Sequence, residues 1–194
     1  MTGLAADRPE GNDEMTDSAP TPDDRELQNA QLQKAVIVAL RPGQPRRVLA
    51  EAMRFAGLLS APLVVVHVDV TRFVTFEDPD GMVHSAPIDL NIDTGAEEFA
   101  ELRAEVEDAL AGSGLTWTAR QLVGDPALAI KHLSGELDAQ LIVVGTRSRG
   151  LGESIREFFT GSVAARLSHR QSRPILVVPL EEPIADDKKD PWAE

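Results

Sequence analysis

The chain has 194 residues, which is enough for one well-buried domain, and its formal net charge is −13. It contains no cysteine, which excludes disulfides and thiol metal sites. It also contains no tyrosine, which argues against base stacking on aromatic side chains, so we expect no nucleic-acid partner. No apolar run is long enough to span a membrane and the N-terminus has no signal-peptide core, so we expect a cytoplasmic protein without membrane contact.

The acidic charge is concentrated at the two ends of the sequence. Residues 1–31 contain eight acidic and two basic side chains, and residues 180–194 contain six and two. Neither segment has an apolar period, so we expect residues 1–31 and 181–194 to be disordered acidic tails. Residues 32–180 then form one domain whose net charge is close to zero.

The first half of this domain alternates strand and helix patterns. The apolar run 35–40 predicts a strand that is covered on both faces. Residues 46–60 predict a helix with one apolar face, formed by Val48, Ala52, Phe55, Ala56 and Leu59. A second apolar run at 63–68 predicts the next strand. Residues 71–94, which contain the turn sequence Asp78-Pro79-Asp80-Gly81, are expected to form a long loop or lid.

The same alternation continues in the second half. Residues 95–111 predict a helix that buries Phe99, Leu102, Val106 and Leu110, and the alternating segment 115–122 predicts a strand nearer an edge. Asp125-Pro126 predicts an N-cap followed by proline at the first helical position. The apolar side of that helix is expected to consist of Leu128, Ile130, Leu133 and Leu137.

Two more strands and one helix complete the pattern. Residues 141–144 predict a buried strand, and residues 175–178, followed by Pro179, predict a final strand at the sheet edge. Either Thr160 or Ser162 can cap the helix between them, which buries Val163 and Leu167. The alternation predicts an α/β fold: an open, five-stranded, doubly wound parallel sheet with helices on both faces.

Ligands of such sheets bind beyond the carboxyl ends of the strands, and the sequence has a candidate site there. Val144-Gly145 leads into Arg147-Ser148-Arg149, and Gly161-Ser162-Val163 opens the last helix. Free backbone N–H groups beside a helix N-terminus favour a phosphate. The alternative is structural: Gly145 ends a strand tightly, Ser162 only caps a helix, and the arginines pair with Glu153 and Glu157.

Arginines are concentrated in two loops that are expected to flank this site. The loop after the first strand contains Arg41, Arg46 and Arg47, and the loop after the fourth contains Arg147, Arg149 and Arg156. Because a guanidinium group binds phosphate oxygens in a bidentate manner, we expect a phosphorylated ligand. The alternative is that the first three arginines are only hydrated at the start of a helix.

Three motifs give the chain a resemblance to a known family. They are Gly124-Asp125-Pro126, Val143-Val144-Gly145 with Gly161-Ser162, and the final run Arg173-Pro174-Ile175-Leu176-Val177-Val178-Pro179. With the order of elements, they make residues 34–180 similar to the universal stress protein family. The resemblance implies the strand order 3-2-1-4-5, a base contact near Val68 and Asp69, and a homodimer formed by antiparallel pairing of the edge strand 174–179.

The nucleotide-binding signature of that family is altered here. Relatives that bind ATP have a glycine, two residues, a second glycine, nine residues, and then glycine with serine or threonine. Gly145 matches the first glycine, but Ser148 occupies the second position and twelve residues separate it from Gly161. The loop Leu40–Pro45 also lacks the aspartate that ATP-binding members usually have. The resemblance therefore implies the fold, with ATP or another nucleotide as an open possibility.

No motif for catalysis accompanies the candidate site. The four histidines have no metal-type spacing, His67 is expected to be a core residue, and no nucleophile elbow is present, so we expect neither a metal nor an enzyme. The leading hypothesis is a stress-response or signalling domain that binds a nucleotide without turnover. The alternatives are an interaction module that has lost its ligand and meets an acidic surface, including its own tail, and slow nucleotide hydrolysis.

Overall fold

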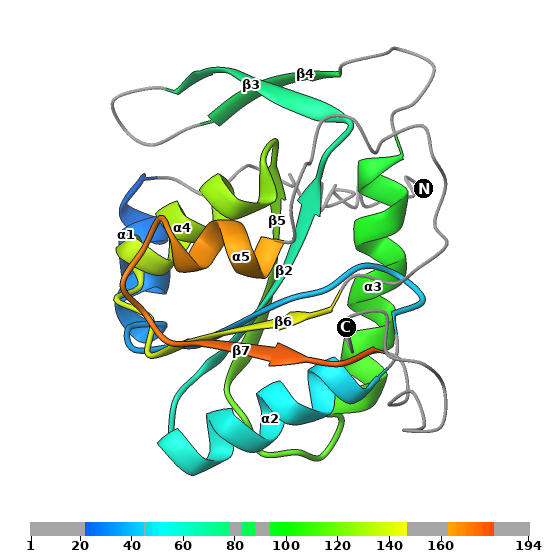
Figure 1. The fold of residues 1–194 in the computed structure, drawn as a ribbon, viewed down its shortest axis with the longest axis vertical. Coiled ribbons are helices and arrows are strands. Elements are labelled where there is room, and N and C mark those ends of the chain that lie inside the picture. The colour runs from blue at the N-terminus through cyan, green and yellow to red at the C-terminus, as the bar shows by residue number, and fades with distance from the viewer. Residues whose placement is uncertain (1–21, 45, 78–82, 88–93, 147–162, 181–194) are drawn as a thin grey trace, which may run out of the picture.

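A computed structural model describes residues 22–44, 46–77, 83–87, 94–146 and 163–180 (Figure 1). Helices and strands alternate along these residues. In chain order they are α1 (Pro22–Gln31), β1 (Val36–Ala39), α2 (Arg47–Leu59), β2 (Leu63–Asp69), β3 (Arg72–Glu77), β4 (Val83–Pro87), α3 (Gly95–Leu110), β5 (Trp117–Val123), α4 (Pro126–Glu136), β6 (Leu141–Gly145), α5 (Val163–Ser168) and β7 (Ile175–Val178). Among the described helices, none has the length and apolar character that crossing a membrane requires.

The central sheet has five strands in the order β5-β2-β1-β6-β7, and every neighbouring pair is parallel. Numbered by their sequence within this sheet, the strands have the order 3-2-1-4-5, so the predicted architecture is confirmed. Strands β5 and β7 lie at the two edges, as the patterns at 115–122 and 175–178 predicted.

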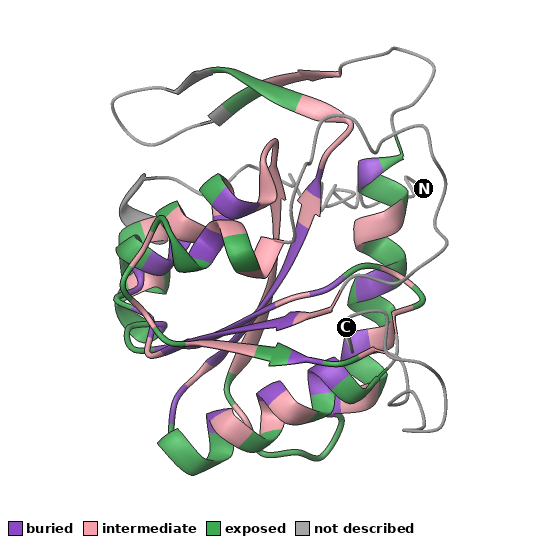
Figure 2. Cartoon of the chain, viewed as in Figure 1, coloured by how far each residue is buried: buried purple, intermediate pink, exposed green. Residues whose placement is uncertain are grey.

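Both faces of the sheet are covered, which explains the continuous apolar runs. Successive side chains of a strand point to opposite faces. Val38 and Val65 accordingly pack towards α2 and α3, whereas Ile37 and Val64 pack towards α4 and the other helices of the opposite layer. Figure 2 shows that the central strands are buried over most of their length.

The predicted helix faces are confirmed with two exceptions. Asp125 caps α4, and one of its carboxylate oxygens accepts the Leu128 N–H at 3.0 Å. Leu59, which is 41% exposed, and Leu128, which is 37% exposed, were predicted to be core residues and instead face solvent. Leu59 lies in the last turn of α2 and Leu128 in the first turn of α4.

Residues 22–31 correct the prediction of a disordered tail over 1–31, because they form helix α1. The only large apolar side chain in α1 is that of Leu27, and it is exposed, so the helix has no apolar period. It is instead attached by polar contacts and by the residue after it. Arg120 of β5 donates to the Asn29 side chain at 2.7 Å, and Leu32 is buried in the core.

Residues 71–94 also differ from the prediction of a loop or lid, because they contain the antiparallel pair β3–β4. Phe73 pairs with Ala86, and the register shifts between Val74 and Phe76. Aromatic and β-branched residues of β3 favour the extended conformation. The turn sequence at 78–81 lies outside the described residues. In Figure 1 the pair lies beyond the end of β2, from which the chain enters it.

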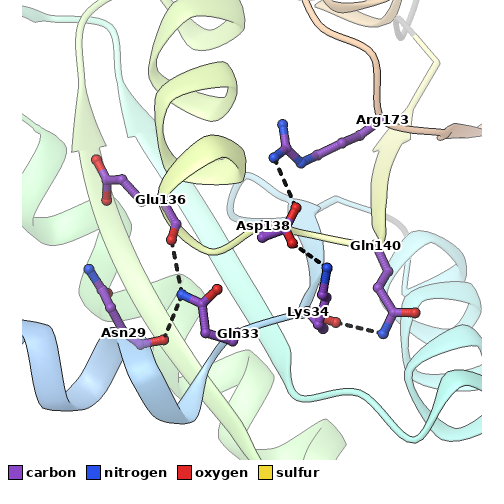
Figure 3. A network of polar contacts seen from close by, with 7 residues as sticks. All are labelled: Asn29, Gln33, Lys34, Glu136, Asp138, Gln140 and Arg173. Carbon is purple, nitrogen blue, oxygen red and sulfur yellow. Dashed lines mark hydrogen bonds and ion pairs between the residues drawn. The ribbon is translucent and has the colours of Figure 1, made fainter.

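A polar network connects the amino ends of three strands (Figure 3). Lys34, before β1, forms an ion pair with Asp138, before β6, and Arg173, before β7, donates to the same carboxylate at 3.4 Å. Gln140 donates to the Lys34 carbonyl at 2.8 Å. The hydrogen bond and charge of Lys34, followed by those of Arg173, lower the pKa of Asp138. This network lies at the end of the sheet opposite to the candidate site.

Candidate functional site

The strand order reverses between β1 and β6, and their carboxyl ends therefore open a shared site. Ala39, the last residue of β1, is in register with Val66 of β2 on one side and Val144 of β6 on the other. The chain leaves β1 towards α2 and leaves β6 towards β7, on opposite sides of this boundary. The two loops that begin here thus start side by side, which is where doubly wound sheets bind ligands.

Gly145 lies directly under two side chains from other parts of the chain. A Cβ atom added to it would lie 2.6 Å from Gln44 Nε2 and 2.9 Å from Leu180 Cδ2. A side chain at this position would therefore require the ends of the Gln44 and Leu180 side chains to move. Neither Gln44 nor Leu180 was predicted as a site residue, and nothing in their local sequence marks them, because this contact joins three segments that are separated in the sequence.

The backbone after Gly145 is already engaged in hydrogen bonds. The Thr146 N–H donates to the Val178 carbonyl at 2.9 Å, and the Leu180 N–H donates to Thr146 Oγ1 at 2.9 Å. Val144 is buried, with its side chain in the core on the α4 side, so it offers only backbone atoms to a ligand. Any phosphate-binding amides of this loop must therefore follow Thr146.

Several predicted site residues lie outside the described residues. They are Arg147, Ser148, Arg149, Gly161 and Ser162, together with Arg156. Val163 is the first described residue of α5 and is half-buried against the core on the α4 side. The structure therefore describes five of the ten predicted contact residues: Arg41, Val68, Val144, Gly145 and Val163.

The arginines after β1 are exposed, and among the described residues one of them, Arg46, has an acidic partner. Arg46 Nη2 lies 3.2 Å from Asp108 Oδ2 of α3. Within the described ranges, Arg41 and Arg47 have no carboxylate within 4.0 Å. The guanidinium groups of these two residues are thus available to an anion.

A small hollow separates this loop from α3. Arg41, Gln44 and Arg46 line it together with Glu105, and its apolar wall consists of Leu40, Leu49, Leu102, Val106 and Ala109. Its volume of about 30 Å³ is far below the roughly 300–1,000 Å³ of typical ligand pockets. Glu105 accepts the Gly43 N–H at 3.3 Å, which holds the loop close to α3. This hollow is therefore too small for a nucleotide, and Gly145 is not among the residues that line it.

The end of β2 holds a buried carboxylate beside Val68. Asp69 is 2% exposed, and its Oδ1 accepts hydrogen bonds from the Thr71 N–H at 2.8 Å and the Thr71 hydroxyl at 2.6 Å. Its Oδ2 has no hydrogen-bond partner among the described residues. Gly95 lies against it, because a Cβ there would be 1.9 Å from Oδ2. The first turn of α3 thus faces this carboxylate with its partial positive charge.

His67 is a core residue, as predicted. It is 1% exposed, its ring stacks on Phe99 with centroids 6.5 Å apart, and its Nε2 lies 3.4 Å from Glu98 Oε2. The part of the chain that the structure describes contains no group of three His, Cys, Asp or Glu side chains able to hold a metal ion.

The geometry defines an open, doubly wound α/β domain with its candidate site at the reversal of strand order. The family model described as "Universal stress protein family" matches residues 32–179. The chain therefore belongs to the universal stress protein family. No curated protein matches its sequence.

Solved structures agree with this fold. A universal stress protein from Archaeoglobus fulgidus is 23% identical with a TM-score of 0.53, and the match covers 74% of this chain and 97% of that one. The structure from the same organism in complex with dAMP is 22% identical with a TM-score of 0.52, covering 76% and 98%. A family member from Burkholderia pseudomallei is 24% identical with a TM-score of 0.52, covering 75% and 96%.

Proposed function

We propose that this domain binds a nucleotide or another phosphorylated small molecule at the carboxyl ends of β1, β2 and β6. The binding event acts in a stress response or in signalling in the cytoplasm, without turnover of the ligand. One observation carries the proposal: at the reversal of strand order, the exposed Arg41 lies in the loop whose Gln44 contacts Gly145, and the exposed Arg47 begins α2 directly after this loop. The dAMP complex of the A. fulgidus relative supports an adenine nucleotide as the ligand class.

Each predicted contact residue has a specific role in this proposal. Arg41, Arg147 and Arg149 bind phosphate oxygens, and backbone N–H groups from Ser148, Gly161 and Ser162 complete the phosphate site. The remaining contacts are apolar or backbone contacts from Val68, Val144, Gly145 and Val163. No metal ion is required by these roles.

The side chains over Gly145 set an energetic cost for binding. A ligand that approaches Gly145 must displace the side chains of Gln44 and Leu180. Leu180 is partly buried, so its exposure costs about 1–2 kcal/mol, which lowers the apparent affinity about 5–30-fold. We therefore expect the wild-type chain to bind its ligand more weakly than a variant that lacks the Leu180 side chain.

Isothermal titration calorimetry of the full chain with ATP, ADP and AMP tests this proposal directly. Gly145→Asp should abolish binding, because the carboxylate would add both bulk and negative charge. Gly57→Asp is the matched control, since nothing lies within 4 Å of a Cβ at Gly57. Absence of binding below 1 mM for the wild-type chain would refute the proposal.

The closed hollow favours a second candidate function, an interaction module without a small ligand. In that case Arg41 and Arg47 meet an acidic protein surface. Gly145→Asp distinguishes the two functions, because it should leave binding to an acidic partner largely intact.

We further propose a homodimer through residues 174–179. Strand β7 is an edge strand, and Val177 on it is 44% exposed. Antiparallel pairing of two β7 strands would satisfy the backbone groups of both edges.

A further inference from the structure

A second hollow lies at the amino ends of β2 and β5, at the end of the sheet opposite to the candidate site. Pro62 directly precedes β2 and Thr116 directly precedes β5, and both residues line this amino-end hollow together with the last residues of α1 and α2. Its volume is about 300 Å³, against about 30 Å³ for the hollow beside α3, and no residue lines both. It therefore reaches the lower end of the roughly 300–1,000 Å³ of typical ligand pockets.

The lining of the amino-end hollow is uncharged. Among the described residues, no Lys, Arg, His, Asp or Glu lines it. Its polar side chains are those of Gln31, Ser60 and Thr116, and its apolar wall consists of Ala56, Ala61, Pro62 and Leu115. An ion would lose part of its hydration here without gaining a partner of opposite charge. The hollow therefore suits an uncharged molecule with both apolar and hydrogen-bonding groups.

Ser60 reaches this hollow from an unfavourable backbone conformation. It is the C-cap of α2, with φ 50° and ψ 39°, in the left-handed region that glycine adopts without cost. Its N–H donates to the Gly57 carbonyl at 3.2 Å, and the Ala61 N–H donates to the Ala56 carbonyl at 2.9 Å. A glycine would form both hydrogen bonds equally well. What serine adds at this position is a hydroxyl group beside the hollow, at a cost in stability.

Gly57 is a second residue that lowers stability at the same place. It lies inside α2, where alanine is more favourable than glycine. Nothing lies within 4 Å of a Cβ at this position, and its φ is not in the left-handed region, so neither packing nor the backbone requires glycine. The missing side chain instead leaves the hollow open on the α2 side. Local choices that oppose stability are expected at functional sites.

We propose that the amino-end hollow is a second binding site, for an uncharged small molecule that combines an apolar face with hydroxyl or amide groups. The apolar face packs against Pro62 and Leu115, and the polar groups form hydrogen bonds with Gln31, Ser60 and Thr116. A volume of about 300 Å³ equals about ten water molecules of about 30 Å³ each, so a ligand of about ten non-hydrogen atoms fits. This site does not depend on the proposed phosphate site, and either can fail without the other.

The first test is an amide NMR titration of the full chain with benzamide, an uncharged amide of this size. Saturable shifts are expected at Gly57, Ser60 and Thr116, and none at Thr146 at the other end of the sheet. The expected dissociation constant is about 1–10 mM, which is usual for so small a ligand. Benzoate is the matched charged probe and should bind at least about tenfold more weakly. Absence of saturable shifts with benzamide, or equal shifts with benzoate, would overturn the inference.

The second test separates binding from folding with two variants. Gly57→Leu places a side chain at the hollow and should weaken benzamide binding about tenfold, while raising the urea midpoint because leucine favours the helix. Ser60→Gly removes the hydroxyl and should weaken binding about three- to tenfold, while also raising the midpoint. Gly135→Leu in α4 is the matched control, since nothing lies within 4 Å of a Cβ there and the residue is outside the hollow. It should leave benzamide binding unchanged. Equal affinity in wild type and both variants would refute the inference.

Discussion

Leu180→Ala separates stability from ligand binding, because the two should change in opposite directions. The substitution removes three carbon atoms from a partly buried side chain that packs against the core between the sheet and α2 and α3. We expect the free energy of unfolding to fall by about 1–2 kcal/mol. The same atoms lie 2.9 Å from the Cβ position of Gly145 and block it. Their removal should therefore tighten ATP binding about 5–30-fold, the factor that corresponds to 1–2 kcal/mol.

Urea unfolding and calorimetry with ATP measure the two effects on the same preparation. Leu128→Ala is the matched control, because Leu128 is an exposed leucine at the start of α4. It should lose at most about 1 kcal/mol of stability and leave ATP affinity unchanged. A Leu180→Ala variant that is less stable but binds ATP with wild-type affinity would show that Leu180 does not obstruct the ligand.

Three further predictions concern packing, acid stability and assembly. Gly95→Ala should lower the free energy of unfolding by about 1–3 kcal/mol, because the added methyl group would overlap the Asp69 carboxylate. Gly57→Ala should raise the free energy of unfolding by about 0.5–1 kcal/mol, because nothing lies within 4 Å of the added methyl group and alanine favours the helix. Urea unfolding measures both changes, and equal effects would contradict the packing argument. Lys34 lowers the pKa of Asp138 in the folded state. The ionised carboxylate therefore stabilises the fold at pH values above the ordinary aspartate pKa of about 3.9, and this stabilisation is lost as the pH falls through the lowered pKa of the folded state. The stability advantage of the wild type over Asp138→Asn should therefore shrink between about pH 5 and pH 2 in urea unfolding, and an advantage that does not depend on pH would contradict this prediction. Val177→Lys should convert the proposed dimer into a monomer in light scattering, and a wild-type monomer at micromolar concentration would disprove the dimer.

The central sheet could be predicted because strands that are buried on both faces consist of continuous apolar runs in the sequence. Ile37 and Val38 are fully buried on opposite faces, and so are Val64 and Val65, so the first run contains no polar residue and the second contains one, His67. The order of the strands came from the resemblance to relatives, since apolar periods specify which residues form strands but not which strands are neighbours.

Two elements were missed because their stabilising contacts are not local. Helix α1 has no apolar stripe, and its contact with Arg120 joins residues 91 positions apart. The β3–β4 pair depends on cross-strand partners such as Phe73 and Ala86, while the intervening Asp-Pro-Asp-Gly sequence indicates only a turn. Periodicity in the sequence indicates which side chains are buried, and few side chains of these elements are buried.

At the candidate site, the structure gives a packing role for Gly145 that the sequence did not reveal. Gly145 was interpreted as a ligand loop or a tight strand end, whereas in this conformation it makes room for Gln44 and Leu180. Asp69 was interpreted, with Val68, as lying near a base contact implied by the resemblance, whereas the structure buries its carboxylate against Gly95. Both contacts connect segments that are distant in sequence, so no local pattern could reveal them.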